Sequence, residues 1–327
     1  MQIEVAGNPI VYFNGRYVLQ SEVRIGILTH ALHYGTGVFE GIRAYWNAEH
    51  EELYCFRMLE HYERWKQNCG LLHIDVPLSA EELCNVTLEL LRRNNFHTDV
   101  YVRPLAYKSA ERIGVSMDGQ NSFALVAVPF GDYLPSSHGI HAGVSSWRRI
   151  DDNSIPARGK ICGAYVNSVL ASDEVKLAGF DEAILLNQDG HVAEGSTCNI
   201  FMVRKGQVIT PSASENILEG ITRDTILELV RNELHGMAVE RPVDRSELLV
   251  CEELFFTGTA VGIAPVTRVN HRPVGNGLQG PIATELRRLY LNIVHGEVPR
   301  YAHWLMPVYG VTASSVCEGT MAGSVIH

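Results

Sequence analysis

The chain has 327 residues, of which 46% are hydrophobic and 20% are charged. These proportions are those of a globular protein, so they exclude a disordered chain, a collagen and a coiled coil. The formal net charge is −10, from 27 basic and 37 acidic residues. A chain of this charge repels phosphate backbones and anionic lipid, so we expect no nucleic-acid partner and no membrane partner.

The length predicts about two domains. The seven cysteines are odd in number and include no Cys-x-x-Cys pair, which is typical of free thiols in a reducing compartment. Residues 1–20 show no secretory signal pattern, and the longest apolar stretch, 254–267, is too short for a membrane helix. We therefore expect a soluble, cytoplasmic protein.

The first half of the chain is typical of a mixed α/β domain. Asn14-Gly15 is the turn dipeptide of a two-residue hairpin loop, which predicts a hairpin over 10–19. Apolar residues at helical spacing predict a helix over 59–68. Ser79 and Glu82 form a capping-box pattern at the start of the next helix. Two strands are then predicted, over 100–107 and 122–129.

A stretch rich in Gly, Pro and Ser after Pro129 is the best candidate for an interdomain linker. The expected organisation is a small N-terminal domain, an interdomain loop, a large domain and a flexible tail, over 1–133, 134–142, 143–309 and 310–327. The large domain should contain, in chain order, a helix after Gly163, a β-meander over 183–209, a helix over 222–234, a strand over 254–256 and a helix opened by Pro281.

The surrounding sequence argues against a functional role for several short motifs. Gly275-x-Gly277-x-x-Gly280 matches a dinucleotide fingerprint, but no strand and no βαβ unit frame it. The pairs His30/His33 and His138/His141 lack the carboxylates of a metal site, so we expect no metal. The chain contains neither the P-loop pattern nor Gly-x-Ser-x-Gly, so nucleotide and serine hydrolysis have no sequence support.

Lys160 is the first candidate for chemistry. It lies between Gly159 and Gly163 among small residues, where a ring could approach the backbone closely. Burial lowers the pKa of an amine, which favours Schiff-base formation. Local sequence alone also fits an exposed loop lysine.

Glu194 is the second candidate, because it lies in an otherwise apolar, small-residue strand. An unpaired buried carboxylate is costly, so it must meet a positive group, and a protonated ring nitrogen would serve. An edge-strand or outward-facing glutamate remains open.

Two loops and one strand supply the remaining candidate functional residues. Gly220-Ile221-Thr222 begins a helix whose N–H groups would attract phosphate, and Thr257-Gly258-Thr259-Ala260 is a second hydroxyl-bearing turn. Each also fits an ordinary cap or turn. Tyr101 and Arg103 are two apart on a strand and so share one face, which suits a carboxylate within apolar surface.

These segments, together with residues 30–45, resemble the class IV pyridoxal-phosphate aminotransferases, most closely the bacterial branched-chain amino acid aminotransferases. The likeness covers about residues 8–309 in order and spacing. It implies the two-domain α/β (α+β) architecture of fold-type IV, pyridoxal 5′-phosphate as cofactor, and a homodimer or a higher homo-oligomer.

The resemblance also implies roles for individual residues. Lys160 matches the lysine that forms the internal aldimine and later carries the proton, and Glu194 matches the acid beside the pyridine nitrogen. The other matches to cofactor-binding positions are Arg64, Tyr165, Leu218, Ile221, Thr222 and Thr259. The matches to substrate-binding positions are Tyr34, Phe39, Tyr101, Arg103, Phe130, Tyr133, Thr259 and Ala260.

Within the substrate set, Arg103 matches the arginine that meets the distal carboxylate of glutamate. Tyr34 matches a residue that reaches the neighbouring subunit's site. Phe130 stands where some bacterial members have tryptophan, so the pocket width departs from theirs.

The implied reaction is ping-pong transfer of the amino group of L-leucine, L-isoleucine or L-valine to 2-oxoglutarate, giving branched 2-oxo acids and L-glutamate. A D-amino acid or (R)-amine transaminase and an aminodeoxychorismate lyase share the lysine and the phosphate site, and Tyr101 and Arg103 favour the L-branched-chain reading. A non-catalytic nucleotide-binding protein, using residues 275–280, is the alternative from another class.

Overall fold

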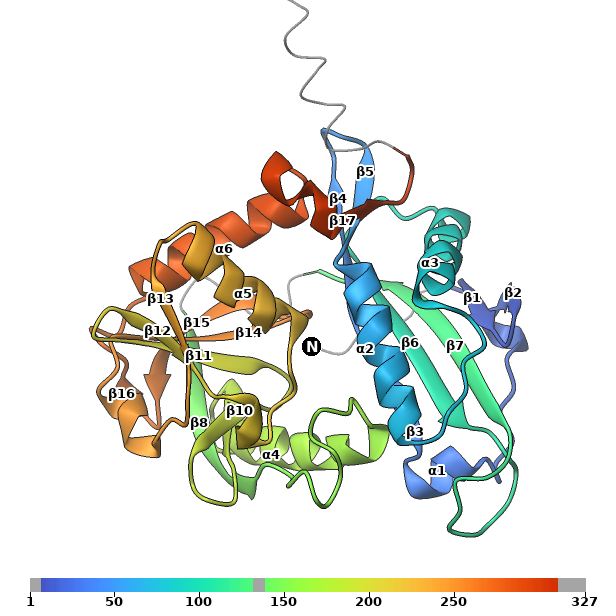
Figure 1. Ribbon diagram of the computed structural model, residues 1–327, viewed down its shortest axis with the longest axis horizontal. Helices are drawn as coiled ribbons and strands as arrows, with labels where there is room; N and C mark the ends of the chain where they lie inside the picture. The colour runs from blue at the N-terminus through green and yellow to red at the C-terminus, as the bar shows by residue number, and fades with distance from the viewer. Residues whose placement is uncertain (1–6, 132–138, 311–327) are drawn as a thin grey trace, which may run out of the picture. The chain divides into compact units, whose positions relative to one another are not determined.

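The computed structural model describes residues 7–131 and 139–310. The chain divides into two compact units, Met1–Gly131 with Leu289–His327, and Asp132–Arg288. Each unit is built on its own mixed set of strands and helices (Figure 1). The expected α/β class is confirmed.

The first unit contains an eight-stranded sheet in the order β17-β5-β4-β6-β7-β1-β2, with β3 paired to β6. Neighbouring strands in this sheet run antiparallel. Its strands are β1 (Ile10–Phe13), β2 (Arg16–Leu19), β3 (Gly37–Phe39), β4 (Ile42–Asn47), β5 (Glu52–Phe56), β6 (Val100–Lys108), β7 (Asn121–Pro129) and β17 (Leu305–Pro307). The predicted hairpin is confirmed: Asn14 and Gly15 have φ of 46° and 89°, as its turn requires.

The helices of this unit are α1 (His30–Tyr34), α2 (Met58–Leu71) and α3 (Ala80–Asn94), with the short 3-10 helices η1 (Gln20–Glu22) and η5 (Pro299–Trp304). The capping box at α3 is confirmed, because Glu82 N donates to Ser79 Oγ at 3.1 Å and Ser79 N donates to Glu82 Oε2 at 2.7 Å. α2 packs through Tyr62 and Trp65, both fully buried, and Trp65 Nε1 donates to Val38 O in β3 at 3.1 Å. This contact fixes α2 beside β3.

The second unit contains a nine-stranded sheet in the order β10-β9-β8-β15-β14-β11-β12-β13, with β16 paired to β15. Its strands are β8 (Ile140–Arg148), β9 (Glu182–Leu186), β10 (Val192–Gly195), β11 (Asn199–Arg204), β12 (Gln207–Thr210), β13 (Met237–Glu240), β14 (Glu253–Gly258), β15 (Gly262–Val269) and β16 (Arg272–Pro273). β8 runs parallel to both β9 and β15.

The predicted β-meander over 183–209 is wrong. β9 pairs with β10 and β11 pairs with β12, as the two turn signals predicted. In the sheet order, however, β8, β15 and β14 stand between β9 and β11. A turn signal fixes which two strands form a hairpin, but pairing between hairpins depends on contacts distant in sequence.

The helices of this unit are α4 (Tyr165–Leu177) and α5 (Ile221–Asn232), with η2 (Cys162–Ala164), η3 (Ala213–Glu215) and η4 (Arg245–Leu249). Ala171 and Val175 of α4 pack on Ala183 and Leu185 of β9. On the other face of the sheet, Leu254 and other buried hydrophobic residues form a larger core. A sixth helix, α6 (Pro281–Val294), begins in this unit and ends in the first.

Two boundaries differ from the expected organisation. The stretch after Leu289 belongs with the first unit rather than with 143–309, because β17 pairs with β5. β8 begins at Ile140, inside the predicted loop 134–142. Residues 132–138 lie outside the described residues, as do 311–327 of the predicted tail, so the assignment of two domains joined by a loop stays a prediction.

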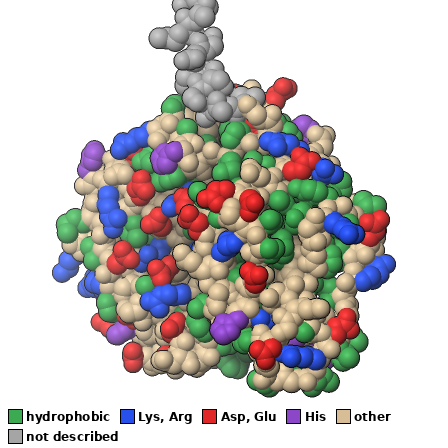
Figure 2. All heavy atoms as spheres, turned by 45° about the vertical axis from the view of Figure 1, so that its right-hand side comes forward, with side chains coloured by type: hydrophobic (Ala, Val, Ile, Leu, Met, Phe, Trp, Pro, Cys, Tyr) green, Lys and Arg blue, Asp and Glu red, His purple; other side chains and the backbone are tan. Residues whose placement is uncertain are grey.

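Among the described residues, no helix is both long and apolar enough to cross a bilayer. On the face drawn in Figure 2, acidic and basic side chains are interspersed with apolar ones, and the basic ones form no continuous stripe. The six cysteines in the described ranges are free thiols.

Candidate active site

Lys160 lies in the second unit, just before the short helix that leads into α4. Its Nζ donates to the hydroxyl of Tyr165, the first residue of α4, at 2.6 Å. The lysine is half-buried rather than a fully exposed loop residue. Arg158, two residues earlier, pairs with Glu219 at 2.9 Å and so ties the lysine loop to the segment that leads into α5.

Glu194 lies on β10, is only 6% exposed, and has three polar partners. Arg149 Nε lies 2.8 Å from its Oε1. Its Oε2 accepts hydrogen bonds from Asn199 Nδ2 at 3.0 Å and from the backbone N–H of Leu218 at 3.1 Å. The outward-facing alternative is therefore wrong for this residue, although β10 is an edge strand of its sheet.

Burial is the main influence on the Glu194 carboxyl and raises its pKa above the ordinary value. Arg149, the Leu218 amide and the charge of Lys160 each oppose that rise. The carboxyl is thus a buried acid whose charge depends on a few named donors, and Lys160 is close enough to be one of the groups acting on it.

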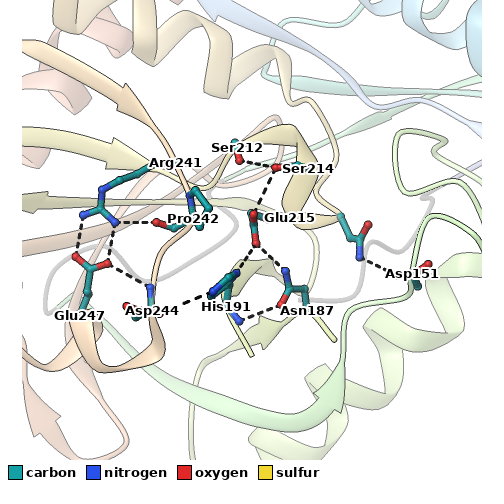
Figure 3. Close-up of polar contacts among 11 residues, drawn as sticks. Asp151, Asn187, His191, Ser212, Ser214, Glu215, Arg241, Pro242, Asp244 and Glu247 are labelled. Carbon is teal, nitrogen blue, oxygen red and sulfur yellow. Dashed lines mark hydrogen bonds and ion pairs between the residues drawn. The ribbon is translucent and has the colours of Figure 1, made fainter. Parts of the chain in front are cut away.

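Figure 3 shows a polar network around Glu215, which lies three residues before Leu218. Glu215 Oε2 accepts from Asn187 Nδ2 at 2.7 Å and faces His191 Nδ1 at 3.1 Å. The neighbouring carbonyl of Asn216 accepts from Arg149 Nε at 3.1 Å. The same arginine therefore holds both the carboxyl of Glu194 and the backbone just before Leu218.

The N-terminus of α5 lies against the same cluster. Its first turn contains Ile221 and Thr222, both buried, and its N-cap is Gly220. A Cβ on Gly220 would come within 2.0 Å of Asn199 Oδ1, so only glycine allows this close approach. The helix begins with backbone N–H groups that can bind an anion.

Thr259 and Ala260 form the turn between β14 and β15 and are partly exposed. Thr257 precedes the turn and pairs in register with Asn199 across β11 and β14, so the two side chains share one face of the sheet. The Thr257 hydroxyl is fully buried and finds no hydrogen-bond partner among the described residues.

In the first unit, Arg64 projects from α2 and is bound to Glu40, which follows β3. Arg64 Nε and Nη2 lie 2.8 and 2.6 Å from Glu40 Oε1. The side chain of Arg64 is 14% exposed and that of Glu40 is fully buried. The basic helix face around Arg64 is therefore built around a buried carboxylate.

Four of the predicted substrate residues form one aromatic cluster in the same unit. The rings of Tyr101 and Phe130 lie 5.2 Å apart. The guanidinium of Arg103 lies over the ring of Phe39 at 4.6 Å, and its Nη2 donates to the hydroxyl of Tyr101 at 3.1 Å. A Cβ on Gly41 would come within 2.0 Å of that hydroxyl, so glycine leaves room for it.

The remaining two substrate candidates have different outcomes. Tyr34 lies on α1, is 38% exposed, and its hydroxyl accepts from the Gly114 N–H at 3.0 Å. Its predicted reach into a neighbouring subunit stays a prediction. Tyr133 lies outside the described residues.

The dinucleotide-like glycines serve packing. The carboxylate of Glu253 accepts from the N–H groups of Ile282 and Ala283 at 3.1 and 2.9 Å, at the start of α6. Gly280 packs directly on that carboxylate. A protein anion therefore occupies the helix terminus that a nucleotide phosphate would need.

The described histidines of the two pairs have ordinary partners as well, and His138 lies outside the described residues. His141 Nε2 accepts from the N–H of His271 at 3.2 Å. His30 bonds Thr36 Oγ1 at 2.8 Å and Gly114 O at 3.0 Å, and His33 bonds Ile27 O at 2.9 Å. Over residues 7–131 and 139–310, no group of three His, Cys, Asp or Glu residues is arranged to hold a metal ion.

Comparison with known proteins decides the family. The family model for amino-transferase class IV matches residues 37–269. The chain belongs to the class IV aminotransferases. A probable branched-chain-amino-acid aminotransferase of Aquifex aeolicus (strain VF5) is 50% identical over 299 residues, which are 91% of this chain and 96% of that relative.

Solved structures of class IV aminotransferases share the fold. A branched-chain aminotransferase from Thermoproteus uzoniensis with norvaline has 42% identity and a TM-score of 0.89, over 93% of this chain and 100% of that one. The branched-chain amino acid aminotransferase from Thermobaculum terrenum in its PLP-form has 37% identity and a TM-score of 0.87, over 92% of this chain and 99% of that one.

Sequence reasoning missed three residues that hold predicted site residues: Arg149 and Asn199 beside Glu194, and Glu40 beside Arg64. Arg149 follows another arginine at the end of a strand, and nothing local distinguishes it. Asn199 lies five residues after Glu194, beyond the bend between β10 and β11. Glu40 sits between Phe39 and Gly41, and an acid beside a buried aromatic residue was its only signal.

Proposed function

We propose that this chain catalyses pyridoxal-phosphate-dependent transamination of L-leucine, L-isoleucine and L-valine with 2-oxoglutarate. The products are the branched 2-oxo acids and L-glutamate. The observation that carries the proposal is the set Lys160, Tyr165 and Glu194: an amine held by a phenol, near a buried carboxylate that has three donors.

The residues present fit the cofactor. Lys160 would bind it covalently, Glu194 would face its ring nitrogen, and Tyr165 would lie near its ring hydroxyl. The anion-binding N–H groups of α5 and the space left by Gly220 suit a phosphate. The residues proposed to bind this phosphate or to line the ring are Arg64, Leu218, Ile221, Thr222 and Thr259. When bound, pyridoxal phosphate supplies an aldehyde that condenses with amines and a ring that accepts an electron pair.

The chain's own residues would move and hold protons. Lys160 supplies the amine that takes a proton from the substrate α-carbon and returns it on the cofactor side, as a general base and then an acid. Tyr165, 2.6 Å from this amine, orients it. Glu194 remains anionic through Arg149 and thereby keeps a proton on the group that faces it.

The aromatic cluster suits both substrates. Phe39, Tyr101 and Phe130 offer buried apolar surface to a branched side chain. Arg103 is exposed, with its stem along that surface and its guanidinium between aromatic rings. Such an arginine can pair with the second carboxylate of 2-oxoglutarate without leaving a buried charge unpaired when leucine binds.

The test is a substrate panel. Purified enzyme is assayed with L-leucine, D-alanine and (R)-1-phenylethylamine, each with 2-oxoglutarate or pyruvate as acceptor. We expect L-leucine with 2-oxoglutarate to give the highest kcat/KM. Preference for D-alanine or for the (R)-amine would assign the chain to another activity of the same fold, and a colourless, inactive protein would refute the proposal.

We further propose a cytoplasmic homodimer. Ile27, Leu32, Ile113 and Val115 are 62–94% exposed and lie on two adjacent segments of the first unit, joined by the Thr29–Glu111 bridge. An apolar surface of this kind favours association. Light scattering should give twice the chain mass, and Val115→Glu should shift the protein toward monomer; a monomeric wild type would contradict the proposal.

A further inference from the structure

The carboxylate of Glu40, just after β3, is bound by side chains of two residues of α2, Arg64 and His61. Its Oε1 accepts from Nε and Nη2 of Arg64, and its Oε2 accepts from Gly41 N at 2.8 Å and faces His61 Nδ1 at 2.9 Å. His61 and Arg64 are one turn apart on α2, so both project toward this carboxylate. Glu40 thus connects the end of β3 to one face of α2.

The backbone of Glu40 is fixed as well. Its N–H donates to Pro104 O of β6 at 2.9 Å, and the preceding Phe39 lies under the guanidinium of Arg103. The carboxylate therefore cannot shift without moving the strand pair that carries the aromatic cluster. Arg64 is held against a rigid partner.

Geometry argues that Glu40 orients Arg64 rather than adding attraction for an anion. A carboxylate beside the arginine reduces the net positive charge there, which would weaken phosphate binding if charge alone mattered. It binds the Nε–Nη2 edge of the guanidinium, however, and five N–H groups are available in all. A long arginine side chain held by one edge meets an oxyanion with less loss of rotamer freedom.

We propose that Glu40 is a positioning residue that fixes the Arg64 guanidinium for the phosphate group of the cofactor, with His61 holding the second oxygen of Glu40. This inference rests on the proposed function, since it takes pyridoxal phosphate as the ligand. It assigns to Glu40 a role that acts through Arg64 alone.

Glu52, on β5 of the same unit, is a matched control. It is also fully buried, and its Oε1 accepts backbone N–H groups, from Leu53, Val308 and Tyr309 at 2.7–2.9 Å. Substitution of either glutamate removes a buried carboxylate from the first unit. Only substitution of Glu40 removes a partner of Arg64.

The experiment measures the Kd of the full-length apoenzyme for pyridoxal phosphate and for pyridoxal, which lacks the phosphate. The variants are Glu40→Gln, Glu40→Ala, Arg64→Met, the double variant and Glu52→Gln, each checked for folding by circular dichroism. Glu40→Gln keeps the size and shape of the side chain, but its amide has one acceptor oxygen, whereas Arg64 and Gly41 bond two different oxygens of Glu40. This variant therefore still tests the proposal if Glu40→Ala does not fold.

We expect both Glu40 variants to raise the Kd for pyridoxal phosphate by about tenfold or more, where each tenfold corresponds to ~1.4 kcal/mol. The Kd for pyridoxal should change by less than about twofold. In the Arg64→Met background, the Glu40 substitution should add less than about twofold. Glu52→Gln should leave the ratio of the two Kd values unchanged.

Three results would overturn the inference: a Glu40 variant that binds pyridoxal phosphate as wild type does, equal losses for both ligands, or a full additional loss in the Arg64→Met background. A wild-type protein that does not prefer pyridoxal phosphate over pyridoxal would instead refute the proposed function. The two failures are therefore distinguishable.

Discussion

The ion pair of Arg149 and Glu194 gives the sharpest stability prediction. The two side chains are 9% and 8% exposed and lie 2.8 Å apart. Replacing Arg149 by methionine keeps most of the buried volume but removes the cation that is bonded to Glu194. The carboxyl then keeps Asn199 and the Leu218 amide as donors.

The size of the effect follows from this geometry. Two unit charges about 4 Å apart at an effective dielectric constant of ~20 interact by about 4 kcal/mol. Breaking a buried pair by removing one partner costs about 3–5 kcal/mol, because the remaining charge is uncompensated. We therefore expect Arg149→Met to lower the free energy of unfolding by about 3–5 kcal/mol at pH 8.

The loss should depend on pH. Burial raises the pKa of Glu194 in the folded state, and Arg149 opposes that rise. A carboxyl whose folded pKa is raised stabilises the fold below the unfolded pKa, and that contribution is lost as pH rises through the folded pKa. In Arg149→Met the pKa of Glu194 in the folded state is higher still, because the opposing cation is gone. The variant therefore loses stability over a wider span of pH values toward high pH.

The assay is urea unfolding of the apoenzyme at pH 5 and pH 8. At pH 5 we expect a loss of only about 1–2 kcal/mol, from hydrogen bonds alone. Arg148→Met, at the neighbouring exposed arginine, is the control and should cost less than about 0.5 kcal/mol. Adding Glu194→Gln to Arg149→Met should restore part of the stability at pH 8. An equal loss at both pH values would refute the reasoning.

Three further outcomes are expected. Arg103→Leu should slow the single-turnover half-reaction with 2-oxoglutarate by about tenfold more than that with L-leucine, since one charge-assisted bond is lost; equal losses would exclude its proposed role. Thr257→Val should raise the free energy of unfolding by about 1 kcal/mol, because it removes a buried hydroxyl that has no partner among the described residues; calorimetry showing a loss would contradict this. Glu253→Ala should lower the free energy of unfolding by about 1–3 kcal/mol, because two N–H groups at the start of α6 lose their acceptor. Unchanged urea unfolding would show that these two hydrogen bonds contribute little.

Local chemistry made many elements predictable. The Asn14-Gly15 turn and the Ser79–Glu82 capping box depend on residues within a few positions of each other, and the structure contains both. Lys160 and Glu194 are candidates because each lies among small residues, but local sequence left an exposed lysine and an edge-strand or outward glutamate open, and their roles came from the resemblance to class IV aminotransferases.

Long-range partners were not predictable in this way. Arg149 lies 45 residues before Glu194, and β8 brings it there through the parallel pairing of β8 with β9. The meander failed for the same reason, because β14 and β15 enter the sheet between the two hairpins. β17 returns to β5 across most of the chain, and no local pattern marks that pairing.

The central claim is that Lys160 binds pyridoxal phosphate covalently. Reduction of the purified yellow protein with borohydride, followed by peptide mass spectrometry, tests it most directly. We predict a phosphopyridoxyl adduct on the peptide containing Lys160, together with loss of colour and activity, and no adduct in Lys160→Ala. An adduct on a different lysine, or none in a fully active preparation, would contradict the account.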